Sequence, residues 1–325
     1  MTDEKTKHWA DEEEVIKTNL PLKFTLNLFK VFPSSIVRLC AYPVSFFYLL
    51  FSRRARTEAL LYQNHLRTFF GGDFPKKISS FRQILSFAFC VLEKLEGWLG
   101  KVELNSVEFQ NDDIEPLISQ LEMHKGAVII CSHLGNSELL RSLSSYNRTR
   151  VSWKVPVISV MEIKSTVQFN STLREINPDA GFNVIDPSEI GPDTIIRLAE
   201  FAEKGGLVVI AGDRTSARNR TKNIKKNFLG EEACFPYGTY LIPFLLRIPV
   251  YYMFGMRKKD VVRNPKYKVF VEKSSVALDV PRSKRDAAIE SLCGEFVSKL
   301  EKYCKLYPYQ WYNFYNFWLK MDDDK

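Results

Sequence analysis

Histidine and cysteine are scarce in this chain, which has only four histidines and six cysteines among 325 residues. The cysteines are scattered and form no C-x-x-C pair, so the sequence predicts neither a disulfide framework nor a metal site. Free thiols favour a reducing compartment. The first residues are polar and acid-rich, unlike the basic start and apolar run of a secretory signal peptide.

The signatures of several common enzyme classes are also missing. The chain has no G-x-G-x-x-G after a predicted strand, no G-x-x-x-x-G-K-[ST], no H-E-x-x-H and no G-x-S-x-G. These absences weaken a nucleotide-binding, a zinc-hydrolase and a serine-hydrolase interpretation. No low-complexity segment or internal repeat is present.

The composition is that of a folded globular protein. Hydrophobic residues make up 45% of the chain and charged residues 26%, which is enough for a full core. Lys and Arg number 46 against 38 for Asp and Glu, and the net charge of +8 favours an anionic partner. We predict a helical region at residues 1–60 that associates with membranes, followed by one domain at residues 61–325.

The apolar stretch Leu20–Phe51 predicts membrane contact. Its longest uninterrupted run, Leu39–Phe51, is shorter than the roughly 20 residues that a simple spanning helix requires. Lys23, Lys30 and Arg38 recur on one face of a helix, with apolar residues around the rest, which is a lipid-surface pattern. The alternative is a buried helical hairpin whose cations reach solvent.

Two further segments bear on membrane contact. Residues 52–56 form a basic cluster of the kind that pairs with anionic lipid headgroups. Residues 303–318 are crowded with Tyr, Trp and Phe, which favour the boundary between water and lipid. A C-terminal arm packed over a groove of the core explains the aromatic residues nearly as well.

From about residue 100 the pattern predicts an α/β domain with a mixed, mostly parallel central sheet flanked by helices. Short β-branched runs alternate there with longer helical patterns. We expect strands at 127–131, 155–160, 182–185, 207–211, 250–254 and 267–271. We expect helices at 137–146, 166–176, 193–203, 237–246 and 284–306.

The most informative segment follows the predicted strand at 127–131. His133 stands two positions after that strand, at the carboxyl end where open α/β sheets bind their ligands. Gly135 allows a tight turn, Asn136 or the serine after it can cap the next helix, and Glu138 falls in its first turn. We predict that the loop folds His133 back onto Glu138, whose carboxylate would orient the imidazole as a general base. The alternative is a capping histidine with a capping-box glutamate.

A second polar pair follows the predicted strand at 207–211. Arg214 would present its guanidinium to a phosphate or a developing oxyanion, with Asp213 holding that guanidinium in place. Residues 214–226 hold six cations and no acidic residue, which suits a phosphate-rich ligand or an acidic carrier protein. A solvated basic loop is the alternative. Further on, Gly238 would let a substrate approach the backbone closely, although ordinary packing explains it equally well.

Taken in order, these segments resemble the lysophospholipid acyltransferase superfamily, and within it the branch of late lipid A (lauroyl and myristoyl) acyltransferases and their relatives. The resemblance covers most of the chain, and it rests on order and spacing together. The matching segments are His133 to Glu138, similar to the H-x4-[DE] motif; residues 212–214, similar to a later substrate-contacting block; residues 228–238; and residues 307–311, similar to the C-terminal P-x-Q-W region.

The resemblance implies transfer of a fatty acyl group from a thioester, usually that of acyl carrier protein, to a hydroxyl of a membrane lipid. It implies no cofactor, no metal and no covalent acyl-enzyme. It also implies that the protein lies at the cytoplasmic face of the inner membrane, with peripheral or single-pass attachment. His133 would be the general base and Glu138 its orienting partner. Arg214, Arg174 or Lys164 would stabilise the oxyanion. The implied substrate-binding residues are Asn136, Lys164, Arg174, Asp213, Arg214 and Gly238.

Several alternatives stay open. The acceptor would be a lipid A-like glycolipid, another glycolipid, an aryl-polyene-type lipid or a lysophospholipid, and acyl-CoA could replace acyl carrier protein as donor. A catalytically inactive lipid-binding or carrier-binding protein would keep the same fold. Nucleic acid is disfavoured as a partner because the chain carries no recognisable nucleic-acid-binding motif. A Cys131 thiol nucleophile is disfavoured because the alternation of a strand points that side chain into the core.

Overall fold

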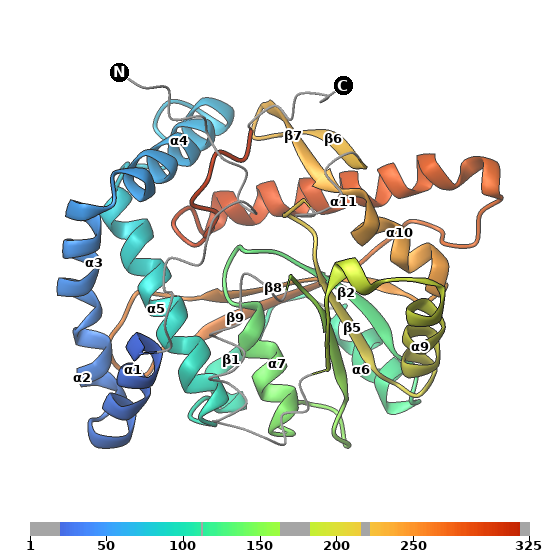
Figure 1. The fold of residues 1–325 in the computed structure, drawn as a ribbon, viewed down its shortest axis with the longest axis horizontal. Coiled ribbons are helices and arrows are strands. Elements are labelled where there is room, and N and C mark those ends of the chain that lie inside the picture. The colour runs from blue at the N-terminus through green and yellow to red at the C-terminus, as the bar shows by residue number, and fades with distance from the viewer. Residues whose placement is uncertain (1–19, 112, 163–182, 216–221, 319–325) are drawn as a thin grey trace.

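A seven-stranded sheet forms the centre of the computed structural model of the chain (Figure 1). The structure describes residues 20–111, 113–162, 183–215 and 222–318. All neighbouring strands of this sheet run parallel except β8 and β9, which confirms the predicted mixed, mostly parallel α/β fold. In spatial order the strands are β1 (Val107–Phe109), β9 (Tyr267–Lys273), β8 (Val250–Arg257), β2 (Ala127–Cys131), β5 (Leu207–Ala211), β3 (Val157–Val160) and β4 (Asn183–Ile185).

The sequence predicted six of these seven strands. It missed β1, which is only three residues long, and it missed the separate antiparallel hairpin of β6 (Asn223–Phe228) and β7 (Glu231–Pro236). The hairpin strands are rich in Lys, Asn and Glu, so they lack the β-branched run that identifies a buried strand. Their pairing depends on the turn at Leu229 and Gly230, both of which have positive φ.

Helices cover both faces of the sheet, because alternate side chains of the strands project to opposite sides. Val128 and Ile130 of β2 belong to one hydrophobic core cluster, whereas Ile129, whose side chain projects to the opposite face of the sheet, belongs to a second cluster. Beside one face lie α9 (Pro192–Glu203), α10 (Tyr237–Leu246) and α11 (Arg285–Leu306), and beside the other lie α6 (Ile114–Glu122) and α7 (Ser137–Ser145). The helices predicted at the positions of α7, α9, α10 and α11 are thereby confirmed, and the helix predicted at 166–176 lies outside the described residues.

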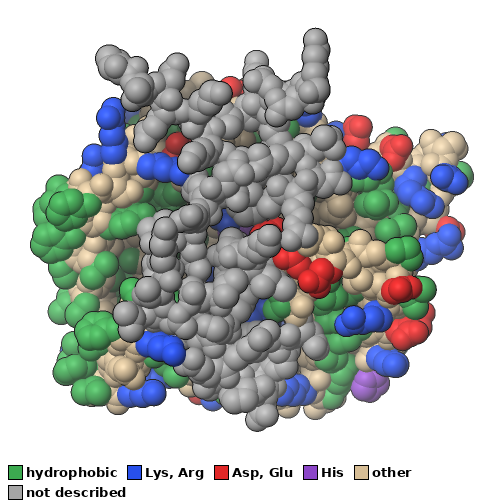
Figure 2. All heavy atoms as spheres, in the orientation of Figure 1, with side chains coloured by type: hydrophobic (Ala, Val, Ile, Leu, Met, Phe, Trp, Pro, Cys, Tyr) green, Lys and Arg blue, Asp and Glu red, His purple; other side chains and the backbone are tan. Residues whose placement is uncertain are grey.

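The N-terminal helices present an apolar outer surface. They are α1 (Leu20–Val31), α2 (Ser34–Leu39) and α3 (Ala41–Phe51), followed by α4 (Arg53–Phe70) and α5 (Ser80–Trp98). Figure 2 shows hydrophobic side chains gathered along the edge that α2 and α3 occupy in Figure 1. The apolar surface, as we call it below, consists of Phe24, Val31, Phe32, Ile36, Leu39, Val44, Phe46, Phe47, Tyr48, Leu50 and Phe51, all exposed.

Together, α2 and α3 form a stretch that is long and apolar enough to span a membrane. This stretch, Ser34–Phe51, is only 22% buried within the protein. Arg38 interrupts this stretch in the sequence, so only Leu39–Phe51 counted there as an uninterrupted run, and we predicted Arg38 on one cationic helix face with Lys23 and Lys30. That placement is wrong, since Lys23 and Lys30 belong to α1 whereas Arg38 belongs to α2, where its side chain is 1% exposed and bonds inside the protein.

Arg38 belongs to a buried ionic cluster that joins α2 to the rest of the domain. Its guanidinium bonds to both carboxylate oxygens of Glu96, and its Nη1 lies 3.5 Å from Glu93 Oε1. Glu93 in turn accepts two 3.0 Å hydrogen bonds from Arg257 Nη1, at the end of β8. A buried charge left without its partner costs several kcal/mol, so α2 is fixed against α5 by electrostatics as well as by apolar packing.

The C-terminal segment packs over the carboxyl edge of the sheet. Trp311 is fully buried, and Tyr312, Phe317 and Trp318 are each at most 6% exposed. Of the two interpretations of the aromatic residues after α11, the packed arm is therefore confirmed for these four side chains. They form part of the core and are not available to lipid.

Candidate functional site

The candidate site lies where the two central parallel strands β2 and β5 end. In their register Cys131 pairs with Ala211, so His133 and Asp213 each stand two residues beyond that pair. Parallel strands end at the same edge of a sheet, which brings these two side chains together although they are 80 residues apart in the chain.

His133 and Asp213 form a hydrogen-bonded pair. The imidazole Nδ1 lies 2.8 Å from Asp213 Oδ1, and the backbone N–H of His133 donates to Asp213 Oδ2 at 2.9 Å. The Asp213 side chain is fully buried, whereas that of His133 is 31% exposed. Nδ1 is the ring nitrogen that faces the buried carboxylate. A neutral His133 that donates from Nδ1 therefore keeps a free lone pair on Nε2.

The electrostatic environment keeps this pair in that protonation state at neutral pH. Burial lowers the pKa of His133 below its ordinary value of 6.5, and the nearby cation Arg214 lowers it further, although Asp213 acts in the opposite direction. Burial alone would raise the pKa of Asp213, but the charge and hydrogen bonds of His133 outweigh it and lower that pKa. The carboxylate is thus ionised while the imidazole is neutral and able to accept a proton.

The structure does not place Glu138 against His133, as the sequence analysis predicted. Glu138 Oε2 instead accepts a 3.2 Å hydrogen bond from Trp98 Nε1 and lies 3.1 Å from Arg141 Nη2. Glu138 does lie in the first turn of α7, as predicted, but that turn faces α5. The partner of His133 comes from the neighbouring strand, and such a cross-strand pair follows from sheet register, which local sequence spacing does not reveal.

The loop between β2 and α7 depends on Gly135. This residue has φ +78°, and a Cβ there would lie 2.2 Å from the carbonyl oxygen of Gly255. Any other L-residue would be strained and would clash with β8. Asn136 then caps α7, with its Oδ1 accepting from the N–H of Leu139 at 3.2 Å. The predicted capping role is confirmed, and Asn136 is buried at 2% exposure.

The C-terminal segment is also part of the site, which sequence analysis missed. Trp311 Nε1 and Asn313 Nδ2 each donate to Asp213 Oδ2 at 3.1 Å. The backbone N–H of Tyr312 donates to the carbonyl of His133 at 3.0 Å, and Gln310 O accepts from the N–H of Gly135 at 2.8 Å. The crowding of aromatic residues indicated that this segment could pack against the core, but nothing in its pattern predicted contact with Asp213.

Two cations act on the imidazole. Arg214 Nε donates to Asn313 Oδ1 at 2.9 Å, so Asn313 joins the guanidinium to Asp213, which the sequence analysis had expected to hold Arg214 itself. Lys94, from α5, also lowers the pKa of His133. This lysine was not among the predicted site residues, because α5 precedes the α/β pattern in the chain. Both cations are candidates for stabilising negative charge near His133.

The other predicted site residues have different outcomes. Gly238 lies in the first turn of α10, where a Cβ would meet no heavy atom within 4 Å, so packing does not require glycine there. Among the described residues we find no contact that joins Gly238 to His133 or Asp213. Lys164 and Arg174 lie outside the described residues, as do residues 216–221 of the basic loop.

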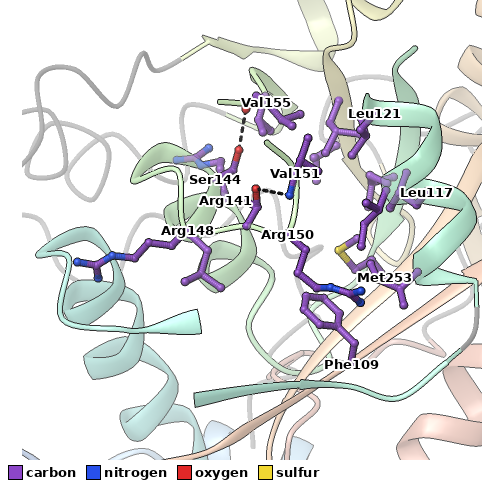
Figure 3. A pocket seen from close by; sticks show the side chains of 18 of the residues that line it. Phe109, Leu117, Leu121, Arg141, Ser144, Arg148, Arg150, Val151, Val155 and Met253 are labelled. Atoms are coloured by element: carbon purple, nitrogen blue, oxygen red, sulfur yellow. Dashed lines mark hydrogen bonds between the residues drawn. The ribbon is translucent and has the colours of Figure 1, made fainter. Parts of the chain in front are cut away.

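An apolar cavity of about 110 Å³ lies on the face of the sheet covered by α6 and α7 (Figure 3). The side chains that line it include Leu117 and Leu121 of α6, Arg141 and Ser144 of α7, and Met253 of β8, which lies beside Leu117. Cys131 and Ser137 also line it, and these two residues bracket the loop that carries His133. The cavity therefore reaches both ends of the loop that carries His133.

Cys131 has no features of a nucleophile. Its side chain is 7% exposed, and burial raises the pKa of its thiol to about 12. The thiol is protonated at neutral pH, which leaves it a poor nucleophile. This agrees with the expectation that alternation along the strand turns Cys131 inward.

We predict that the pKa of His133 depends on Asp213 and not on Glu138. Asp213→Asn removes the negative charge that raises this pKa, so the pKa should fall further, by about one unit or more. Glu138→Gln should change it by less than about a third of that. Titration of isotope-labelled histidine by NMR measures both values, and an equal or larger shift in Glu138→Gln would contradict the pairing.

Comparison with known proteins assigns no family. No protein-family model matches the chain, and no curated protein matches it.

Proposed function

We propose that the protein is an acyltransferase that moves a fatty acyl group from a thioester to a hydroxyl of a membrane lipid. The observation that carries this proposal is the pair of His133 and Asp213 at the carboxyl edge of the sheet, 2.8 Å apart. A neutral imidazole oriented by a buried carboxylate is suited to remove a proton from a hydroxyl. The resemblance of the His133 to Glu138 segment and of the C-terminal segment to the acyltransferase superfamily supports the same reaction.

In the proposed reaction, Nε2 of His133 takes the proton of the acceptor hydroxyl as its oxygen attacks the thioester carbonyl. The C–O bond forms, and the carbonyl oxygen becomes an oxyanion. Arg214 and Lys94 lower the pKa of His133 through their positive charge, and the same charge would stabilise the oxyanion. The intermediate then collapses, the C–S bond breaks, and the imidazolium returns its proton to the leaving thiolate.

In this proposal Glu138 is a positioning residue. Its carboxylate joins Trp98 of α5 to Arg141 of α7, and Arg141 Nη1 also donates to Ser159 Oγ at 3.0 Å. Arg141 lines the apolar cavity, so Glu138 fixes part of the cavity wall. In this proposal Asp213 orients the imidazole of His133, which is the role that the motif resemblance implies for Glu138.

We propose that the apolar cavity receives the acyl chain. Its lining is almost entirely hydrocarbon, and it begins at residues that flank the catalytic loop. Such a lining binds an alkyl chain through the hydrophobic effect and offers few partners to a polar ligand.

We propose that the apolar surface of α1 to α3 docks on an anionic membrane, at the cytoplasmic face of the inner membrane. Eleven exposed hydrophobic side chains form this surface, and the exposed Arg53 and Arg54 follow it directly at the start of α4. Apolar contacts would enter the lipid while these cations attract anionic headgroups. The acceptor lipid, such as a lipid A-like glycolipid or a lysophospholipid, would reach His133 from this membrane, and acyl carrier protein or acyl-CoA would supply the acyl group.

The function is tested by transfer of labelled acyl groups from acyl carrier protein, and separately from acyl-CoA, to a total lipid extract. We expect His133→Ala and Asp213→Asn to lower the rate by about 10²- to 10⁴-fold, because the general base is lost or held in the wrong tautomer. Glu138→Gln should cost less, since it leaves the base and its partner intact. Mass spectrometry of the labelled product identifies the acceptor.

The matched control is His124→Asn, at an exposed histidine of positive φ, a conformation that asparagine tolerates. It should transfer acyl groups at the wild-type rate. Equal rates in wild type and His133→Ala would exclude the proposed catalysis. Absence of product with wild type, combined with intact lipid binding, would favour the alternative of an inactive lipid-binding protein.

The cavity assignment predicts a change in chain-length selectivity. Val209 lines the cavity from β5, and Val209→Phe should fill part of it. We expect transfer of a palmitoyl group to fall at least about tenfold more than transfer of an octanoyl group, because the short chain needs less of the space. The octanoyl rate of the same variant is the internal control. An equal loss for both chains would indicate general damage and argue against the assignment.

Membrane docking through the apolar surface predicts weaker vesicle binding when that surface is made polar. Phe47 is 56% exposed and Phe51 is 83% exposed, so replacing both with serine removes large apolar contacts without emptying the core. We expect affinity for phosphatidylglycerol vesicles to fall by about tenfold for each side chain in a flotation assay. Ile196→Ser on α9, 57% exposed before substitution, is the matched control and should bind as wild type does. Unchanged binding in the double variant would rule out this surface.

A further inference from the structure

The fully buried Trp311 and Asn313 contact Asp213 and do not reach the exposed part of the site. Three donors converge on Asp213 Oδ2, namely the N–H of His133 at 2.9 Å, Trp311 Nε1 at 3.1 Å and Asn313 Nδ2 at 3.1 Å. Trp311 is fully buried, and Asn313 is 1% exposed. Oδ1 is the oxygen that meets the imidazole. The two carboxylate oxygens thus differ in their partners. Oδ2 accepts hydrogen bonds from the C-terminal segment and from the backbone of His133, whereas Oδ1 faces the imidazole of His133.

From this division we infer that Trp311 and Asn313 are positioning residues for the general base: they hold the Asp213 carboxylate so that it orients and tunes His133. The inference rests on the proposed general-base function of His133. Donors on Oδ2 stabilise the ionised carboxylate and draw off part of its charge. They also prevent the carboxylate from turning away from Nδ1.

The same segment fixes the main chain of the histidine loop. Leu134 and Trp311 form an antiparallel bridge, Tyr312 N–H donates to the carbonyl of His133, and Gly135 N–H donates to that of Gln310. The Gln310 side chain bonds to both the N–H and the carbonyl of Arg257, at 2.9 and 2.7 Å, which ties the segment to the end of β8. Movement of the segment would therefore displace both members of the pair together.

The charges around the pair decide the sign of the expected effect. Loss of a donor on Oδ2 leaves more negative charge on Asp213, which stabilises the imidazolium and raises the pKa of His133. The groups facing His133 are Asp213, Arg214 and Lys94, and those that interact with Asp213 are His133, Arg214, Cys131 of β2, Tyr240 of α10 and Cys304 of α11. The thiols and the phenol have pKa values raised by burial, so they are neutral at the pH of the experiment and do not change the sign.

The test is Trp311→Phe, which keeps an aromatic ring and removes the indole N–H. The matched control is Trp318→Phe, which removes another buried indole N–H from the same aromatic cluster. That N–H donates at 2.9 Å to the carbonyl of Phe228, away from Asp213. The full-length proteins are titrated by NMR with isotope-labelled histidine in nanodiscs of phosphatidylglycerol. His124, on the far side of the domain against Trp153, is an internal reference.

We expect Trp311→Phe to raise the pKa of His133 by roughly half a unit to one unit, and Trp318→Phe to leave it unchanged. In the acyl-transfer assay, kcat of Trp311→Phe should fall about tenfold with KM unchanged, and the acid limb of its pH–rate profile should move to higher pH with the pKa. Asn313→Leu, of similar size, removes the other donor and should shift the pKa of His133 in the same direction.

An unchanged pKa of His133 in both Trp311→Phe and Asn313→Leu would overturn the inference, as would an equal shift in Trp318→Phe. The titration needs no turnover, so it separates this inference from the proposed function. If the pKa shifts as expected while no variant and no wild-type protein transfers acyl groups, the positioning of His133 stands and the proposed reaction fails.

Discussion

The buried carboxylate of Asp213 is the interaction on which the rest of the site depends. A charge with no exposure to solvent is stable only if hydrogen-bond donors surround it. Four donors do so, and they come from the loop after β2 and from the C-terminal segment, while the carboxylate itself follows β5. Satisfying this one charge therefore requires three distant parts of the chain to meet at one edge of the sheet, and that is where the imidazole is held.

A second buried ionic cluster connects the apolar surface with this edge. Arg38 of α2 and Arg257 of β8 share Glu93 of α5, and the backbone of Arg257 is bound by the side chain of Gln310. Gln310 then accepts from Gly135 in the histidine loop. Continuous buried polar contacts thus run from the helices proposed to meet lipid to the loop proposed to perform catalysis. Such contacts fix the orientation of the site relative to the apolar surface without requiring any motion.

Particular residues illustrate how far the sequence predicts the site. His133 was identified because a polar residue just after a β-branched run falls at the carboxyl edge of a parallel sheet, which is a local property. Asn136 was identified as a cap for the same reason. Glu138 was assigned as the partner of His133 because it is near in sequence, and this was wrong, since α7 turns it toward Trp98 and Arg141. Arg38 was assigned to an exposed cationic face with Lys23 and Lys30, because helical periodicity does not reveal which neighbours cover a face.

Local sequence patterns were sufficient to predict the α/β class, six strands of the central sheet, the candidate base and the apolar character of the N-terminal helices. These depend on hydrophobic periodicity, turn residues and composition, which act over a few neighbouring positions. The folded structure was needed to show that Asp213 pairs with His133, that Trp311 and Asn313 donate to that carboxylate, and that Arg38 is buried. Each of these findings depends on contacts between residues far apart in the chain. Strand register and the need to neutralise buried charge fix those contacts, and the local spacing of residues in the sequence reveals neither constraint.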